Sequence, residues 1–355
     1  MCCSRDIFKL KYEEIKVSNQ QKIIEVDCKD TLYQKDKMDN YLRRICPNFY
    51  EEFELGQFLN NGSNGIVYEG NYKNKINQDK RYVFKFCFKN KLKKINEISF
   101  LKKLHQKNIN KIISFIKIND NSYFSIFEKG KYGDLGNFLK KQIKKNNLSE
   151  SCINYFTKQI LEALDYIHKN KIIHLDIKEK NIIIDKEFNP IIIDFSISCF
   201  YNQFNSENIV KFPFVGTSKY MAPEILEGTA IKVKYAPVID IYSLGITLYK
   251  LAFGIYPYNL DKIGNNEYDK IRENIKNTKL EFPENIKISE KFKDFLIKIL
   301  DQDYLKRLNI KEALNHPWIK GWQILDDEKQ NLELIEHFFI KLITNSISKF
   351  NEYIK

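Results

Sequence analysis

Hydrophobic and polar positions in the first third of the chain follow the short alternations that are typical of strands with one buried face. Five stretches read as strands: 53–59, 66–72, 82–88, 112–118 and 123–127. A turn rich in glycine and asparagine is expected at 60–65, and apolar residues at helical spacing predict a helix over 95–104. The pattern therefore predicts a small α+β lobe that ends near residue 128.

The rest of the chain has a mainly helical pattern. Ser149 is a suitable N-cap for a helix that continues to His168. Two short apolar strands (182–184 and 191–193) and three later helices are expected, the helices at 239–253, 290–300 and 310–315. A last helix is expected over 326–353, where an apolar stripe is accompanied by early acids and late lysines that suit the helix dipole. We expect it to pack on the domain, with autoinhibition or partner binding as alternatives.

The 355 residues are 43% hydrophobic and 14% aromatic, enough for a substantial core in one large domain or two moderate ones. Disorder throughout the chain is therefore excluded. The formal net charge of +12 raises the question of an anionic partner such as nucleic acid or a membrane surface. Lysine is spread along the whole chain with asparagine and isoleucine, so a general compositional bias is the simpler interpretation and no nucleic-acid partner is expected.

The seven cysteines are odd in number and form no CxxC pair, so neither a disulfide framework nor a zinc site is expected. A reducing compartment, and hence a cytoplasmic location, fits better. No apolar run approaches the roughly 18 to 20 residues that span a bilayer, and no signal-peptide core precedes the fold. Acylation of Cys2 and Cys3, with membrane association, stays open as an alternative to two ordinary exposed thiols.

Polar motifs interrupt the expected elements in a fixed order along the chain. They are NNGSNGIV at 60–67, VFK at 83–85, HLDIKEKN at 174–181, DFS at 194–196, GTSKYMAPE at 216–224, DIYSLG at 240–245 and HPW at 316–318. Together they resemble the motif set of the eukaryotic protein kinase family, over about residues 53–320. The loop at 174–181 is the most specific motif, because an ordinary turn between buried strands would not need this order of residue types.

The resemblance implies an α+β, two-lobe protein kinase fold with a small β-rich N-lobe and a larger, mainly helical C-lobe. It places the N-lobe at 51–128 and the C-lobe at 129–320, between an N-terminal extension at 1–50 and a C-terminal helical extension at 321–355. The implied activity is transfer of the γ-phosphate of ATP, with Mg²⁺, to serine or threonine hydroxyls of protein substrates. We expect a monomer.

The resemblance also implies roles for charged residues. Asp176 would accept the proton of the substrate hydroxyl, and Lys178 would neutralise charge on the transferred phosphate. Lys85 would hold the α and β phosphates, with Glu97 on the following helix as its partner. Thr217 completes the catalytic set, and its presence together with Lys178 resembles the serine/threonine type.

Metal and nucleotide contacts follow from the same resemblance. Asn181 and Asp194 would bind Mg²⁺, and Asp194 ends an apolar strand where a carboxylate without a partner would be costly. Asn60 replaces the first glycine of the phosphate-binding loop, a mild departure because asparagine tolerates positive φ. The hinge that bonds adenine corresponds to 127–130, and Asp134 would reach the ribose or the peptide. The expected nucleotide-binding residues are Asn60, Gly62, Gly65, Val67, Val83, Lys85, Phe127, Glu128, Gly130, Asp134 and Ile183.

Two further departures concern regulation and substrate. Leu175 replaces an arginine that, in the family, reads a phosphate on the activation segment. Phosphorylation of that segment is therefore not expected as the main on-switch, although Ser198, Tyr201 and Ser206 could be modified. Lys180 stands where many kinases with basic substrates carry glutamate, so a preference driven by upstream arginine is not expected.

A pseudokinase that binds nucleotide or partners without turnover is the main alternative. Asn60, Leu175 and Ser196, which replaces a glycine, point toward it. The charge would also allow a nucleic-acid-binding protein or a lipid kinase, but the sequence carries no RNA-binding or zinc-finger signature. An appended EF-hand is excluded because no such loop occurs. Every charged residue that the reaction needs is present, which favours an active enzyme.

Overall fold

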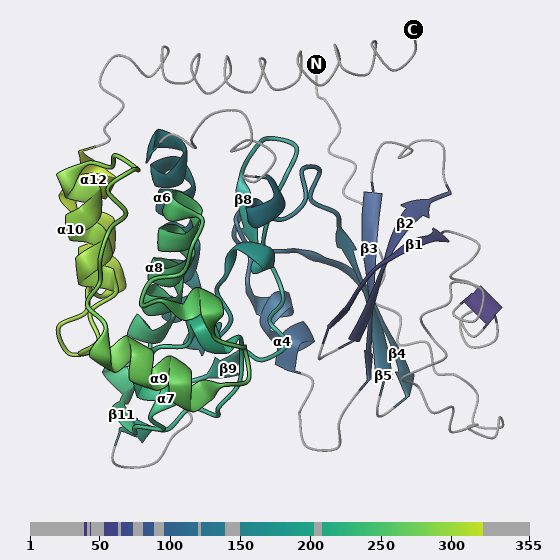
Figure 1. The fold of residues 1–355 in the computed structure, drawn as a ribbon. Coiled ribbons are helices and arrows are strands. Elements are labelled where there is room, and N and C mark those ends of the chain that lie inside the picture. Colours follow the sequence, from purple (N-terminus) through teal and green to yellow (C-terminus); the bar gives the residue numbers. More distant parts are fainter. Residues whose placement is uncertain are drawn as a thin grey trace, which may run out of the picture. The chain divides into compact units, whose positions relative to one another are not determined.

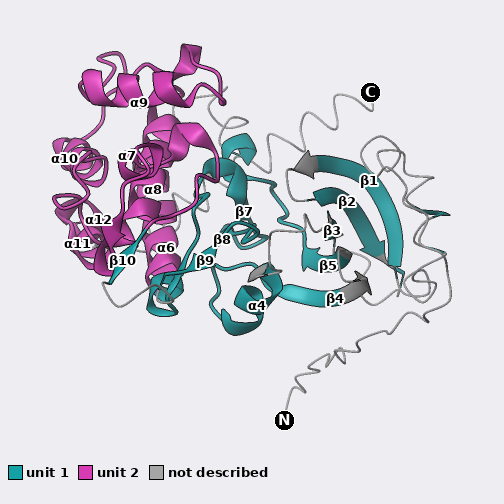
Figure 2. Cartoon of the chain, turned by 90° about the horizontal axis from the view of Figure 1, so that it is seen from below, with its two compact units in different colours: residues 1–138, 166–210 teal, residues 139–165, 211–355 magenta. Residues whose placement is uncertain are grey.

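The structure, a computed structural model, describes residues 39–40, 43, 53–62, 65–73, 81–88, 96–119, 122–138, 150–201 and 208–321. The expectations for Cys2 and Cys3, for most of the N-terminal extension, for Ser206 and for the helix over 326–353 lie outside these residues. The chain forms two compact units, which Figure 2 colours separately: unit 1 comprises residues 1–138 and 166–210, and unit 2 comprises residues 139–165 and 211–355. The expected domain boundaries stay a prediction.

Unit 1 is built on a five-stranded antiparallel sheet with strand order β1-β2-β3-β5-β4. Its elements are β1 (Phe53–Gly62), β2 (Gly65–Tyr72), β3 (Arg81–Phe88), α4 (Asn96–Lys103), β4 (Ile112–Asn119) and β5 (Ser122–Glu128), which can be followed in Figure 1. The five predicted strands and the predicted helix are confirmed.

The expected turn over 60–65 is wrong at both ends, because β1 continues into it as far as Gly62 and β2 begins at Gly65. β1 continues to Gly62, which pairs with Gly65, and Asn60 lies in the strand opposite Val67. Asn60 is not among the residues with positive φ, so the tolerance of asparagine for that conformation is not needed. Glycine is needed at position 65, where φ is 152° and a Cβ would lie 2.1 Å from the carbonyl oxygen of Phe86.

Aromatic side chains fill one face of this sheet. Phe84 and Phe86 of β3 are buried and pack against Phe124 of β5, with ring centroids 5.5 Å and 4.5 Å away. Because successive side chains point to opposite faces, Val83 and Lys85 are on the other side of β3. The hydrophobic alternation of β3 thus separates the core from the face that carries the lysine.

The second part of unit 1 consists of short elements: β6 (Ile172–Ile173), η2 (Glu179–Asn181), β7 (Ile182–Ile184), β8 (Pro190–Ile192), β9 (Cys199–Phe200) and β10 (Ile209–Val210). β7 pairs with β8, and β6 pairs with β9. The apolar strands expected from sequence are confirmed, the second one residue earlier. Ile192 donates to the carbonyl of Asn108 at 2.8 Å and accepts from the amide of Asn110 at 2.9 Å. These hydrogen bonds connect the end of β8 to the segment before β4.

Unit 2 is mainly helical, and its helices are α6 (Glu150–Lys169, of which residues 166–169 belong to unit 1), η3 (Ser218–Tyr220), α7 (Pro223–Leu226), η4 (Val233–Tyr235), α8 (Val238–Phe253), η5 (Leu260–Lys262), α9 (Tyr268–Asn277), α10 (Glu290–Ile299), α11 (Ile310–Asn315) and α12 (Pro317–Lys320); β11 is Ile231–Lys232. All four helices expected here are confirmed. The helix α9 was not expected, because it is mostly polar and only Ile271 and Ile275 of its 10 residues are buried.

Helix α8 forms the core of unit 2. It ends at Phe253 because Gly254 adopts the left-handed conformation with φ of 74°. Within the described part of the chain, the segment Val233–Phe253 has the length and hydropathy of a membrane-spanning helix, which was not expected, and 83% of its most apolar window is buried in the fold. Burial on all sides accounts for its apolar composition.

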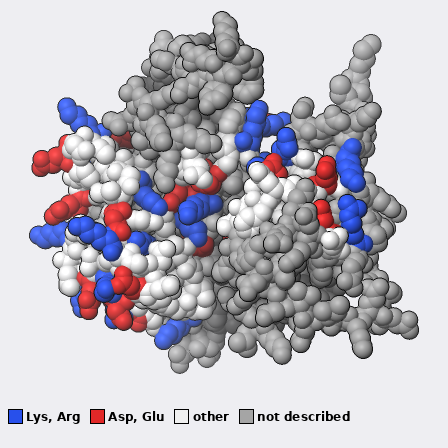
Figure 3. Space-filling model, turned by 45° about the vertical axis from the view of Figure 1, so that its right-hand side comes forward, with Lys and Arg blue, Asp and Glu red and all other residues white. Residues whose placement is uncertain are grey.

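Charged side chains of both signs are interspersed on the described surface that Figure 3 shows. Several form exposed pairs within one helix, such as Lys298 with Asp294 and Lys293 with Glu290 in α10. On this face of the described surface the distribution agrees with the general compositional bias toward lysine.

Candidate active site

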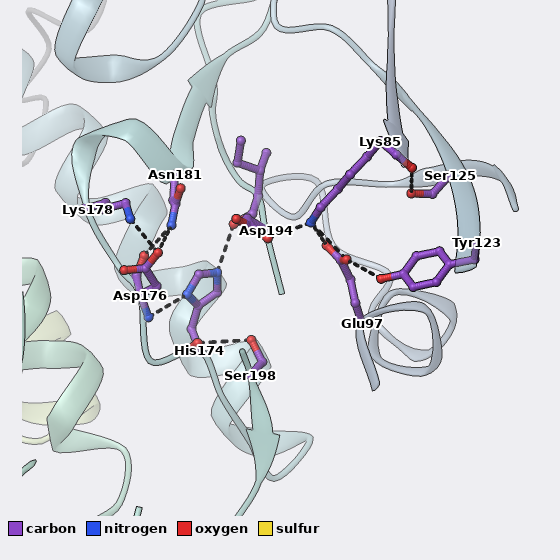
Figure 4. Close-up of polar contacts among 11 residues, drawn as sticks. Lys85, Glu97, Tyr123, Ser125, His174, Asp176, Lys178, Asn181, Asp194 and Ser198 are labelled. Carbon is purple, nitrogen blue, oxygen red and sulfur yellow. Dashed lines mark hydrogen bonds and ion pairs between the residues drawn. The ribbon is translucent and has the colours of Figure 1, made fainter. Parts of the chain in front are cut away.

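Lys85 joins two acidic side chains in unit 1. It lies in the middle of β3, where it pairs with Val67 on one side and with Ser125 on the other. Its Nζ is 2.7 Å and 3.0 Å from the two carboxylate oxygens of Glu97 on α4, and 2.7 Å from Oδ1 of Asp194 (Figure 4). The structure thus brings together three residues that are far apart in sequence, two of them expected as a pair.

The ion pair between Lys85 and Asp194 favours the ionised form of both side chains. Burial would lower the pKa of Lys85, but the charges of Asp194 and Glu97 outweigh it and the pKa is raised well above its ordinary value. Burial would likewise raise the pKa of Asp194, but the Lys85 charge holds it well below the usual range. Asp194 therefore stays an anion, which a role in binding a cation requires.

Tyr123 contacts Glu97, and none of the sequence motifs indicates this contact. Its hydroxyl donates to Oε2 of Glu97 at 3.1 Å, and burial followed by the Glu97 charge raises the pKa of this tyrosine far above its ordinary value. Tyr123 therefore remains a protonated donor. In β5, Tyr123 pairs with Cys87 of β3, and Ser125, two residues later, pairs with Lys85. Alternation along β5 puts Tyr123 and Ser125 on one face of the strand, and this was the only sequence signal for the contact. The register that makes these pairs could not be derived from sequence.

The loop before β7 gathers the second group of predicted residues. Oδ2 of Asp176 accepts from Lys178 Nζ at 2.6 Å and from Asn181 Nδ2 at 2.7 Å. Asn181 Nδ2 also donates to the backbone carbonyl of Asp176 at 2.8 Å. The turn η2 brings Asn181 back over Asp176, so three polar residues of the motif form one compact cluster (Figure 4).

His174 links this loop to the segment around Asp194, although it is not in the expected site set. Its Nδ1 accepts from the amide of Asp176 at 3.3 Å, so Nε2 donates to the carbonyl of Ile193 at 3.0 Å. Ile193 directly precedes Asp194. His174 is therefore a positioning residue that sets the loop against the strand end that carries the acid.

Two residues of the site have backbones in the left-handed region. Leu175 has φ of 68° and Asp194 has φ of 65°, a conformation that costs of order 1–3 kcal/mol for residues other than glycine. Such conformations persist where the surroundings over-determine them, and they are frequent at functional sites. Ser196, at the position of the family's glycine, is not among the residues with positive φ. Its side chain is thus compatible with this backbone.

The expected nucleotide-binding residues belong to unit 1 and line neighbouring strands. Val83 of β3 pairs with Phe127 of β5, which is buried, whereas Glu128 at the end of β5 is exposed. Val67, Val83 and Ile183 are each partly exposed, as residues that line an open surface would be. Their roles toward a nucleotide stay predictions.

The segment after β5 approaches β7 closely. A Cβ on Gly130 would lie 2.9 Å from Cβ of Ile183, so glycine is required for this approach. Asp134 forms a β-bridge with Ile183, and its carboxylate accepts from the backbone amide of Asn137 at 2.9 Å and from Nδ2 of Asn137 at 2.6 Å. Asp134 therefore caps the helical turn that follows it, a local role that accompanies the expected one.

Thr217 is the one member of the predicted set that belongs to unit 2. It precedes η3 and has an extended backbone, with φ of −93° and ψ of 109°. All other predicted site residues belong to unit 1.

Asn181 and Asp194 fit a magnesium ion. Mg²⁺ prefers oxygen ligands and usually takes one or two from the protein, with the rest from water and phosphate. Because the NH₂ group of Asn181 is committed to Asp176, its amide oxygen is the atom that would bind a cation. Among the described residues no group of three or more His, Cys, Asp or Glu side chains could hold a metal, so a closed all-protein site is not the arrangement here.

The activation-segment residues considered for modification are buried where the structure describes them. Ser198 is 4% exposed and its hydroxyl donates to the carbonyl of His174 at 3.1 Å. Tyr201 is 5% exposed and its hydroxyl donates to the carbonyl of His168 at 2.7 Å. In this conformation neither hydroxyl is accessible to a modifying enzyme, so the interpretation of these two as modification sites is not supported.

Comparison with known proteins places the chain in a family. A profile of the protein kinase domain matches residues 53–319. The chain is 32% identical to myosin light chain kinase A of Dictyostelium discoideum over 280 residues, which are 76% of this chain and 88% of that protein. It is 31% identical to testis-specific serine/threonine-protein kinase 1 of Mus musculus over 63% of this chain and 59% of that protein. It is 32% identical to calcium-dependent protein kinase 4 of Plasmodium falciparum over 77% of this chain and 50% of that protein.

The profile match covers more than half of the chain, and the β-sheet region followed by a helical region has the α+β character of the two-lobe kinase fold. The chain spans 59% and 50% of the length of the last two relatives. By its sequence match and its fold, this chain belongs to the protein kinase family.

Proposed function

We propose that this chain is an active serine/threonine protein kinase that uses ATP and Mg²⁺. The observation that carries the proposal is the contact of the buried Lys85 with both Glu97 and the partly exposed Asp194, at 2.7 Å in each case. A lysine held between two carboxylates has a fixed position, as a group that binds phosphate must have. A fold kept only as a scaffold has no need for three charges in this buried arrangement, which is costly without a function.

Asp176 would act on the acceptor hydroxyl. Its carboxylate is oriented by Lys178 and Asn181, which both bond Oδ2. In the reaction Asp176 would orient the substrate hydroxyl and accept its proton, and Lys178 would stabilise charge on the transferred group. Magnesium, held through Asn181 and Asp194, would neutralise charge on the nucleotide phosphates.

A pseudokinase is the second candidate, and three replacements favour it: Asn60, Leu175 and Ser196. Asn60 and Ser196 occupy backbone conformations that need no glycine. Leu175 is 7% exposed and lies beside Asp176 without replacing any charged group that the reaction needs. The replacements are thus more consistent with altered regulation than with loss of catalysis.

The test is transfer of labelled γ-phosphate from Mg-ATP to peptides that differ only in a serine, threonine or tyrosine acceptor. We expect labelling of serine and threonine peptides, and a loss of at least about 100-fold in Asp176→Asn, as is typical when a positioned acid–base group is removed. Asp194→Asn should lose activity and also the thermal stabilisation that Mg-ATP gives the wild type. Stabilisation by Mg-ATP without labelling of any polypeptide would establish the pseudokinase instead, and labelling of tyrosine alone would contradict the acceptor class.

We also propose that activation does not depend on phosphorylation of the activation segment. Leu175 offers no charge to bind a phosphate there, and Ser198 and Tyr201 are buried. Enzyme treated with a protein phosphatase, and confirmed by mass spectrometry to carry no phosphate, should keep most of its initial rate. A loss of activity that returns after autophosphorylation would contradict this proposal.

A further inference from the structure

Unit 2 contains a cluster of cations and aromatic hydroxyls that the proposed reaction does not use. Lys250 of α8 donates to the hydroxyl oxygens of Tyr220 at 2.9 Å and Tyr256 at 2.8 Å, and these two oxygens are 3.2 Å apart. Lys219, next to Tyr220 in η3, places its Nζ 5.0 Å from the ring centroid of Tyr256. We call Lys219, Tyr220, Lys250 and Tyr256 the lysine–tyrosine cluster.

Within the cluster, Lys219 is buried and has no counter-ion among the described residues. The residue is 8% exposed, and within the described part of the chain it forms no ion pair with a carboxylate. The ring of Tyr256 attracts it, but Nζ of Lys250 is 4.2 Å from the same ring centroid, so two ammonium groups share one aromatic ring. A buried ammonium group is costly unless an anion or strong acceptors compensate it.

The carboxylates near the cluster are already engaged. Oδ2 of Asp261 accepts from the amide of Tyr256 at 3.0 Å, and Oε2 of Glu267 accepts from the amide of Gly264 at 2.6 Å. The pKa of Glu267 is lowered chiefly by its hydrogen bond with Lys270, and Lys219 makes the smallest contribution. Glu267 thus interacts with the charge of Lys219, but among the described residues neither acid forms an ion pair with Lys219.

The hydroxyl groups add donors of their own. An ammonium group only donates, so both tyrosine oxygens act as acceptors toward Lys250. When Tyr220 donates to Tyr256, the Tyr256 oxygen has accepted twice and its own proton is left for an acceptor outside the cluster. A nearby ammonium and a phenol donor together suit the oxygens of a carboxylate or a phosphate.

We propose that the lysine–tyrosine cluster is an anion subsite that binds an acidic or phosphorylated side chain of the protein substrate. This inference rests on the proposed function, because Thr217 belongs to the proposed catalytic set and Lys219 follows it by two residues. Thr217 and Lys219 of the enzyme are therefore at most about 7 Å apart along the chain, the length that two fully extended residues span. A peptide whose acceptor hydroxyl is presented at Thr217 therefore has neighbouring side chains within reach of Lys219, and a negative one is favoured.

The test uses the full chain and one serine peptide in four versions, in which the residues that flank the acceptor are aspartate, phosphoserine, alanine or arginine. We expect kcat/KM to be about tenfold higher for the aspartate and phosphoserine versions than for alanine, and lowest for arginine, with the difference shrinking at high salt. Lys219→Glu and the double variant K219E/K250E should invert this order. Lys219→Gln, which is milder if charge reversal prevents folding, should flatten it.

Lys234→Glu is the matched control. Lys234 also lies against a tyrosine, with Nζ 4.7 Å from the ring centroid of Tyr235, but it is exposed and outside the cluster. Its replacement should leave the order of the four peptides unchanged. The same loss of selectivity in this variant would show that only overall charge is measured and would overturn the subsite.

Failure of the subsite and failure of the proposed function give different results. Equal rates for the four peptides, or a preference for arginine, overturn the subsite while the enzyme stands. If no peptide is labelled, binding is measured by fluorescence anisotropy with versions that carry alanine at the acceptor position. Tighter binding of the aspartate or phosphoserine version that is lost in Lys219→Gln still supports the subsite without turnover. The two acidic versions also distinguish a phosphate from a carboxylate as the preferred ligand.

Discussion

At the scale of single residues, the charges of the site depend on neutral neighbours that hold them in place. Glu97 receives two contacts from Lys85 and a third from the hydroxyl of Tyr123. Asp176 is oriented in part by His174, which also reaches the carbonyl before Asp194. Tyr123 restricts the side chain of Glu97, whereas His174 restricts the backbone that carries Asp176 and Asp194, and both thereby help to position the charged groups.

The first prediction concerns Tyr123→Phe. Removing the hydroxyl leaves one oxygen of a buried carboxylate with one donor fewer, which typically costs about 1–3 kcal/mol. Because Lys85 keeps both of its contacts with Glu97, we expect a loss near the lower limit in urea denaturation, together with a raised KM for ATP. Tyr132→Phe is the matched control, since the ring of Tyr132 stacks on Phe188 at 4.4 Å. Equal stability of the two variants would contradict a role for the Tyr123 hydroxyl.

At the scale of elements, short helices depend on their caps. α12 has only 4 residues, and His316 at its N-cap accepts from the amide of Trp318 through Nδ1 at 3.2 Å. Nε2 of the same ring bonds Oδ2 of Asp294 on α10 at 2.9 Å. The neutral ring with its proton on Nε2 satisfies both contacts. A second proton on Nδ1 would remove the acceptor that caps the helix.

The second prediction is a loss of stability when His316 becomes protonated. Burial lowers its pKa below the ordinary 6.5, with the hydrogen bond to Asp294 acting in the opposite direction. The folded state therefore binds this proton less readily than the unfolded chain. Its contribution to stability is present above the ordinary pKa and is lost as pH falls from there toward the lowered value. Asp294, whose pKa is lowered mainly by Lys298, stays ionised in this window.

Thermal melts at several pH values between 5 and 8 would measure this dependence. His316→Asn keeps a good N-cap residue but cannot titrate, so its melting temperature should vary less with pH than that of the wild type. Parallel curves for the two proteins would assign the pH dependence to other histidines.

At the scale of the whole molecule, each compact unit has a buried polar contact that joins distant parts of its sequence. In unit 2, Nη1 and Nη2 of Arg307 bond the two carboxylate oxygens of Glu224 at 2.7 Å and 2.9 Å. Arg307 also stacks on Tyr242 of α8, with its Cζ 4.8 Å from the ring centroid. Glu224 belongs to α7, which directly follows Thr217 and η3, and Arg307 lies between α10 and α11. The contact therefore holds the segment of Thr217 and η3 against this later part of unit 2.

The third prediction is that Arg307→Ala destabilises unit 2 by about 3–5 kcal/mol, because it leaves the carboxylate of Glu224 buried without its partner. Arg307→Met combined with Glu224→Gln removes both charges and should cost less than the single variant. Denaturation followed by tryptophan fluorescence, to which Trp318 and Trp322 contribute, would measure both. Lys306→Ala is the control, since its exposed pair with Asp303 should contribute less than about 1 kcal/mol. A similar loss for Lys306→Ala and Arg307→Ala would contradict the assigned role of burial.

Much of the fold and of the candidate site could be predicted from sequence. The strands β1 to β5 and the helix α8 have strong alternation or long apolar runs, so local pattern alone located them. The helix α9 and the short turns at η3 and η5 were not predicted, because α9 is mostly polar with only two buried side chains and a single turn leaves little pattern. The residues of the motif around Asp176 are within five residues of one another, so the sequence alone placed them in one local segment, while their roles stay predictions.

By itself, then, the sequence determined the family, the order of the elements and the chemistry available at each motif, because these depend on residue type and short-range spacing. Only the tertiary structure decided which distant groups meet. The register of β3 against β5 placed Tyr123 and Ser125 beside Lys85, and folding of the chain placed Lys250 beside Lys219. The physical reason is that strand register and helix packing are settled by the burial of many side chains at once, which no local pattern contains.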